Sequence, residues 1–159
     1  MKTEYKKKFA DNWFNYLQSQ ICKEFEKLEK MYSGKQNKFM RRDWYKEDKR
    51  LGGGTSFILK NGNIFEKVGV NKSTVSGIFP KKFRSNILGA NKNGKYWASG
   101  ISVVAHMKNP RIPAIHFNTR FIVTSKEWFG GGMDVTPSHE DKEEKLYVHD
   151  ELKKVCLHN

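Results

Sequence analysis

Polar and apolar side chains alternate between residues 114 and 122. His116, Asn118 and Arg120 occupy the even positions, and the odd positions between them are mostly large and apolar. Alternate side chains of a β-strand share a face, so the segment predicts a strand with one apolar and one polar side. A guanidinium binds carboxylates through paired hydrogen bonds, an amide donates and accepts, and an imidazole transfers protons near neutral pH. An ordinary half-exposed sheet face shows the same alternation, so this pattern alone leaves a structural and a functional interpretation open.

The preceding segment, 96–106, extends this argument. It is also strand-like, and Ser102 and His106 fall on its even positions. If the two strands form a hairpin with even positions opposite even positions, these side chains join His116, Asn118 and Arg120 on one surface. An odd register would separate the two sets, so the shared surface is an expectation that depends on the pairing.

A metal site is a second hypothesis for the same region. His106, His116 and His149 carry imidazoles, and Asp134 offers an oxygen ligand. None of them has the short local spacing that makes a metal assignment specific. His149 also shares a predicted helix face with Leu152 and Cys156, so it equally fits a position at the rim of the core.

The elements that would position these residues are a helix, several adjacent strands and a last helix. Residues 4–32 predict a helix that faces the core, and strands are expected over 55–60, 64–70 with an extension over 73–79 past a kink, 96–106 and 114–124. Asn61 and Gly62 predict a hairpin turn, and a capping box of Ser138 and Asp141 predicts the start of a helix over 140–156. The stripe of the first helix consists of Phe9, Trp13, Leu17, Ile21, Phe25, Leu28 and Met31.

These elements predict an α+β fold, with a mainly antiparallel sheet flanked by helices. We expect residues 1–159 to form a single domain, with a helix and a basic loop over 1–50, the sheet over 51–137 and a helix over 138–159. Residues 33–50 are expected to be irregular. The glycine triplets at 52–54 and 130–132 indicate a helix break and a turn or bulge.

Composition narrows the class of protein. The 159-residue chain carries a formal net charge of +13, which attracts anionic partners in general, but most of its basic residues are lysines, so a solvated lysine-rich surface explains the charge as well. No stripe of basic residues interleaved with exposed aromatics is evident, which argues against nucleic acid. No apolar run is long enough to span a membrane, and Cys22 and Cys156 have no metal or redox spacing, so we expect a reduced, cytoplasmic protein.

Four segments together resemble the oxygen-dependent coproporphyrinogen III oxidase family. They are the glycine run at 52–56 and the sequences NGNIFEKVGVN at 61–71, HMKNPRIPAIHFNTR at 106–120 and WFGGGMDVTP at 128–137. The ordered match runs from about residue 40 to the end of the sequence. Such a combination is far more specific than any one glycine triplet.

The resemblance implies a reaction. Members of this family oxidatively decarboxylate two propionates of coproporphyrinogen III to vinyl groups, giving protoporphyrinogen IX in heme biosynthesis, with O2 as oxidant and no organic cofactor. The resemblance also implies a homodimer and a role for each of several residues in the site. In that site His116 is the proton donor, Asp134 faces the substrate, and Ser102, Asn118, Thr119 and Arg120 bind it, while His106 and His149 fall at positions of divalent-metal ligands.

The family's chains are much longer than this one. The resemblance therefore implies the N-terminal half of the family fold, from a truncated or split member, with a complementary C-terminal chain as a further expected partner. The alternative is a catalytically inactive remnant that still binds porphyrin carboxylates.

Overall fold

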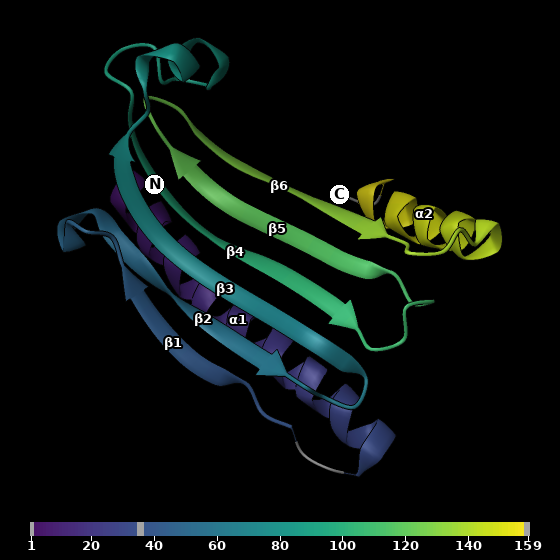
Figure 1. The fold of residues 1–159 in the computed structure, drawn as a ribbon. Coiled ribbons are helices and arrows are strands. Elements are labelled where there is room, and N and C mark those ends of the chain that lie inside the picture. Colours follow the sequence, from purple (N-terminus) through teal and green to yellow (C-terminus); the bar gives the residue numbers. More distant parts are fainter. Residues whose placement is uncertain (1, 35–36, 158–159) are drawn as a thin grey trace.

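The computed structural model describes residues 2–34 and 37–157, which form one long helix, a six-stranded sheet and a second helix (Figure 1). Helix α1 spans Thr3–Ser33, and α2 spans Lys142–Leu157. Two 3₁₀ segments, η1 (Lys49–Leu51) and η2 (Lys81–Asn86), lie between strands. The predicted α+β class is confirmed.

The sheet is an antiparallel meander. Each strand pairs with the next one in the chain, so that β1 and β6 form the two edges. Short connections between neighbouring strands favour this order. The strands are β1 (Met40–Tyr45), β2 (Gly52–Lys60), β3 (Phe65–Ile78), β4 (Lys95–Met107), β5 (Ala114–Val123) and β6 (Glu127–Thr136).

Two strands form where the sequence predicts irregular structure. β1 lies inside the segment 33–50 that we expected to be a loop, and all its residues are exposed. The triplet 130–132, expected to be a turn or bulge, lies within β6, and the triplet 52–54 begins β2. Strand formation depends on the partner strand as well as on local propensity, so β2 and β5 supply the hydrogen bonds that polar or glycine-rich segments do not specify alone.

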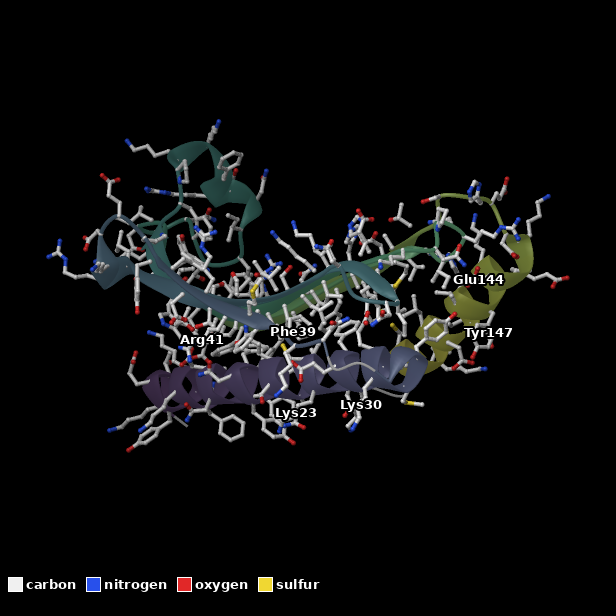
Figure 2. All side chains as sticks on the ribbon, turned by 60° about the horizontal axis from the view of Figure 1, so that its bottom comes forward. Lys23, Lys30, Phe39, Arg41, Glu144 and Tyr147 are labelled. Atoms are coloured by element: carbon white, nitrogen blue, oxygen red, sulfur yellow. The ribbon has the colours of Figure 1, made fainter. Side chains whose placement is uncertain are left out.

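Helix α1 packs along β3 and β4, on one face of the sheet (Figure 2). Its buried side consists of Ala10, Phe14, Gln18, Cys22 and Glu29, with Leu17, Ile21 and Phe25 partly buried beside them. These pack against a sheet core that includes Val68, Val70, Ile101, Val103 and Phe121.

The predicted core stripe of α1 is therefore only partly right. Phe9, Trp13, Leu28 and Met31 are exposed. At 3.6 residues per turn, each step of four residues advances by about 40° around the axis, so a stripe built mainly from such steps winds away from the sheet at its ends. Burial of Cys22 raises the pKa of its thiol to about 12, and both cysteines are free.

A partly buried polar contact anchors α1 to the sheet near the N-terminal end of the helix. Asp11 Oδ1 accepts hydrogen bonds from Lys72 Nζ at 2.6 Å and from Ser99 Oγ at 3.1 Å, and also from the hydroxyl of Thr74. Burial acts to raise the pKa of Asp11, but these donors and the Lys72 charge hold it below its usual value.

A second contact fixes the hairpin between β2 and β3, which turns at Asn61 and Gly62 as predicted. The side chain of Glu29 is fully buried beside this turn. Its carboxylate accepts from the backbone N–H groups of Asn63 at 2.6 Å, Ile64 at 3.0 Å and Phe65 at 2.9 Å. One helix side chain thus satisfies backbone donors that neither strand pairs.

The start of α2 differs from the predicted capping box. Asp141 is the cap, because its Oδ1 accepts from the backbone N–H groups of Glu143 and Glu144 at 3.0 Å each. The helix begins at Lys142, and none of its residues is buried.

Candidate functional site

The pairing of β4 with β5 brings the predicted polar residues onto one surface. Ser102 lies opposite Asn118, and Val104 lies opposite His116, so even positions face even positions. The odd residues Ile101, Val103 and Ala105 are buried toward α1. The polar set therefore lies on the sheet face away from α1, which confirms the assumption on which the shared surface depended.

The imidazole of His116 is held by a carboxylate on the next strand. His116 and Asp134 are register partners, and Nδ1 lies 3.0 Å from Asp134 Oδ2. Thr136 Oγ1 donates to the same oxygen at 2.9 Å. These two hydrogen bonds, the one with His116 first, lower the pKa of Asp134, so the group is ionised at neutral pH. When Nδ1 donates to Asp134, Nε2 is left as the ring nitrogen for proton exchange.

Arg120 and Asn118 form the second part of the site. Arg120 Nη2 donates to Asn118 Oδ1 at 2.6 Å, and Arg120 is exposed. The remaining N–H donors of the guanidinium can bind a carboxylate, and the Asn118 amide nitrogen adds another donor. Ser102, opposite Asn118, is exposed on the same face and adds a hydroxyl.

Two neighbouring hollows in this face extend the site toward β1 and β3. One of about 280 Å³ is lined by Arg120 and Ser102 together with Trp44 of β1, and one of about 480 Å³ is lined by His106 and Lys67. Asn71 of β3 lines both hollows, so they adjoin.

Sequence reasoning missed Trp44, Lys67 and Asn71. β3 pairs with β4 in an odd-to-even register, with Asn71 opposite Ser102 and Lys67 opposite His106. Counting even positions therefore cannot find Asn71 and Lys67, and Trp44 lies on β1, in the segment that was expected to be irregular. The GVN segment of the family resemblance contains Asn71, which was the available signal for this residue.

The glycines of β6 keep this part of the face open. Gly132 lies opposite Asn118, and Gly130 lies opposite Arg120. A Cβ built at Gly132 would meet nothing within 4 Å, and one at Gly130 would meet only the Trp128 ring, at 3.8 Å. The missing side chains leave room above the binding groups for a bulky ligand.

Two predicted site residues lie apart from this surface. Thr119 is an odd residue of β5 that pairs with Ile101, so its side chain is expected on the α1 face, although the residue also lines the 280 Å³ hollow beside Arg120. His149 is exposed on α2 and lines a separate cavity of about 610 Å³ between α2 and β6, to which Asp134 also contributes. Its assignment at the core rim is wrong for the described structure.

The positions of the histidines bear on the metal hypothesis. The rings of His106 and His116 have centroids 5.9 Å apart. Among residues 2–34 and 37–157, no three histidine, cysteine, aspartate or glutamate side chains gather as a ligand set. The described part of the chain does not by itself fit a divalent-metal site, and the assignments of His106 and His149 stay predictions.

Comparison with known proteins decides the family. The coproporphyrinogen III oxidase profile matches residues 9–159. The chain belongs to the coproporphyrinogen III oxidase family. Within it, oxygen-dependent coproporphyrinogen-III oxidases of Rickettsia typhi and Rickettsia prowazekii are each 52% identical to this chain over 161 residues, and that of Rickettsia felis is 50% identical over 160.

The alignments cover this chain and its relatives unequally. Each of these alignments includes 98% of this chain but 56% of the relative. The chain thus spans little more than half the length of the coproporphyrinogen III oxidases that it matches. Within residues 2–34 and 37–157, no helix is long and apolar enough to cross a membrane.

Proposed function

We propose that this chain supplies the carboxylate-binding and proton-transfer part of an oxygen-dependent coproporphyrinogen III oxidase. The observation that carries the proposal is the common face of Ser102, His116, Asn118 and Arg120, in which His116 is hydrogen-bonded to Asp134. The match of the family profile over residues 9–159 supports the choice of substrate.

The substrate's chemistry fits this face. Coproporphyrinogen III carries four carboxylates on a bulky, flexible macrocycle. Arg120, Asn118 and Ser102 bind a propionate, and the open strip at Gly130 and Gly132 admits the ring. The exposed Lys67 at the adjoining hollow adds a second cation on the same face, and the chain's net charge of +13 attracts a tetra-anion.

In the proposed reaction two of the four propionates react, and each of these becomes a vinyl group. The side chain loses CO2, one proton and two electrons, and O2 accepts the electrons without an organic cofactor. His116 exchanges the proton through Nε2 while Asp134 fixes the ring. His106 and His149 stand as proposed metal ligands, and a complete ligand set would need groups from outside the described residues.

The proposed assembly is the homodimer that the family resemblance implies, or a complex with a complementary C-terminal chain, which the 56% coverage of a relative suggests. We place it in the cytoplasm, where the free Cys22 and Cys156 stay reduced. Nucleic acid is not part of this proposal.

The test combines porphyrin binding with turnover. Coproporphyrin binding is followed by fluorescence quenching, and oxygen-dependent formation of protoporphyrinogen is followed by its oxidised, fluorescent product. Arg120→Ala is expected to weaken binding, while His116→Ala lowers turnover and leaves binding largely unchanged. Arg41→Ala is the matched control, because Arg41 projects from β1 on the α1 side of the sheet (Figure 2).

The outcomes separate the alternatives. If the wild-type chain binds porphyrin without turnover and Arg120→Ala abolishes that binding, the chain is a remnant that retains only the carboxylate site. Equal binding by wild type, Arg120→Ala and Arg41→Ala rejects the site itself.

A further inference from the structure

The outward face of α1 carries an aromatic group that the fold leaves exposed. Tyr5 is 67% exposed, Phe9 74%, Trp13 48% and Tyr16 56%. The ring centroids of Trp13 and Tyr16 lie 5.6 Å apart, so these two rings are neighbours. We call these four residues the aromatic segment of α1.

A row of lysines continues the same face toward the C-terminal end of the helix. Lys23 and Lys30 lie on the side of α1 that points away from the sheet (Figure 2). At about 100° per residue, Tyr5, Phe9, Tyr16, Lys23, Lys27 and Lys30 fall within a sector of about 60°, roughly opposite the buried side. The outward face is therefore aromatic over its first half and basic over its second.

The carboxylates of α1 leave this positive charge largely uncompensated. Asp11 and Glu29 are turned toward the sheet, and Glu26 accepts from the backbone N–H of Phe39. Glu4 pairs with Lys7 and Glu24 pairs with Lys27. Among the described residues, no carboxylate pairs with Lys8, Lys23 or Lys30.

We propose that the outward face of α1 is a docking surface for an anionic phospholipid bilayer. An amphipathic helix with aromatic and lysine residues on its exposed side lies in the membrane interface, where rings enter the headgroup layer and lysines meet lipid phosphates. Tyrosine and tryptophan are enriched at that depth because each carries one polar atom on a large apolar body.

The lysines favour a bilayer over a protein partner. Lysine is depleted in protein–protein interfaces, because burying its hydrated ammonium is costly, whereas anionic lipids attract it without burying it. Nucleic acid is a weaker fit, since stacking surfaces interleave rings with cations and here the two are separated along the helix.

The orientation is compatible with the proposed function but does not depend on it. α1 covers one face of the sheet, and His116, Asn118 and Arg120 lie on the other. A chain that rests on a bilayer through α1 therefore keeps its porphyrin-binding face toward the water.

The experiment is co-sedimentation with vesicles. One set is pure phosphatidylcholine, and the other contains about one-third phosphatidylglycerol, which supplies the negative surface potential. We expect binding to the anionic vesicles, weak binding to the neutral ones, and a marked loss when salt is raised from about 0.1 M to about 1 M, because the Debye length shrinks from about 10 Å to about 3 Å.

Two double variants test the two halves of the face. Lys23→Gln/Lys30→Gln is expected to lower partitioning roughly 25-fold, at about fivefold per lysine. Phe9→Ser/Trp13→Ser is expected to lower it at least about tenfold through lost apolar contact. These side chains are exposed, so the fold is retained, which circular dichroism verifies.

The matched controls carry the same changes elsewhere. Lys81→Gln/Lys92→Gln removes two exposed lysines near η2, and Tyr147→Ser removes an exposed ring of α2. Both should bind vesicles like the wild type. Binding that falls equally in controls and test variants would mean a nonspecific charge effect and would overturn the proposal.

Other occupants give distinct results. Absence of vesicle binding, combined with a dimer that Phe9→Ser/Trp13→Ser dissociates, assigns the face to a second copy of the chain. Preferential binding of a single-stranded oligonucleotide over anionic vesicles assigns it to nucleic acid. Either result rejects the bilayer and leaves the porphyrin site untouched.

Discussion

Replacing Glu29 by glutamine should destabilise the fold strongly although the side chain keeps its size. Oε1 accepts from the N–H groups of Ile64 and Phe65, and Oε2 accepts from the backbone and side chain of Asn63 and from the side chain of Asn37. Glutamine keeps one oxygen. Its NH₂ group then faces at least two donors and can accept from neither.

The magnitude follows from these contacts. A hydrogen bond to a charged group contributes about 1.5–3 kcal/mol, so losing two in a fully buried place costs about 3–6 kcal/mol of unfolding free energy. That is a large share of the ~5–15 kcal/mol typical of a domain. For a chain of this size, the melting temperature should fall by about 10–20 °C.

Urea and thermal unfolding followed by circular dichroism measure this loss. Glu24→Gln is the matched control, because Glu24 lies on the same helix, is exposed, and among residues 2–34 and 37–157 pairs with Lys27 alone. It should change stability by less than about 0.5 kcal/mol. If Glu29→Gln is no more harmful than this control, the carboxylate does not hold the hairpin and the reasoning fails.

Three further predictions concern the polar face and the acid limit. Gly132→Val should leave stability unchanged, because a Cβ at this position meets nothing within 4 Å, and it should weaken porphyrin binding in a fluorescence titration. Gly131→Ala should instead lower the melting temperature, because its Cβ would lie 2.4 Å from the Asn118 carbonyl oxygen. Asp134→Asn should lower turnover at least about tenfold with little change in porphyrin affinity, since it removes the charged partner that orients His116; an equal loss of affinity would show that Asp134 binds substrate instead. Burial opposes the ionisation of Glu29, but hydrogen bonds hold the pKa of its carboxyl in the folded state below the ordinary 4.5. Its contribution to the free energy of unfolding is therefore fully present above pH 4.5 and should be lost as the pH falls through the lower folded pKa. Unfolding curves that do not change below pH 4.5 would contradict this.

The sequence alone determined the local features of the site. Alternation along β5 separated His116, Asn118 and Arg120 from the apolar positions, because the period of two is a property of any extended chain. It also assigned Thr119 to the opposite face, whereas the family resemblance grouped Thr119 with the binding residues. The Asn-Gly signal also located the hairpin turn, although only Asn61 adopts a positive φ there and the Glu29 carboxylate of α1 binds the backbone N–H groups that follow.

Pairing between strands decided the rest. Even residues of β4 lie opposite even residues of β5, which joins the polar residues of the two strands in one surface. Odd residues of β3 lie opposite even residues of β4, which adds Asn71 to that surface. Neither register is encoded by the composition of a single strand, because it depends on turns and on which faces become buried together.

The same reason explains α1, β1 and β6. The sheet selected Phe14 and Gln18 for burial and left Phe9 and Trp13 outside, although both sets are large enough to fill a core. Neighbouring strands supplied the hydrogen bonds that made strands of the exposed β1 and the glycine-rich β6. The sequence thus predicted the chemistry of individual side chains. Which strand or helix each face contacts was decided only when distant segments packed together.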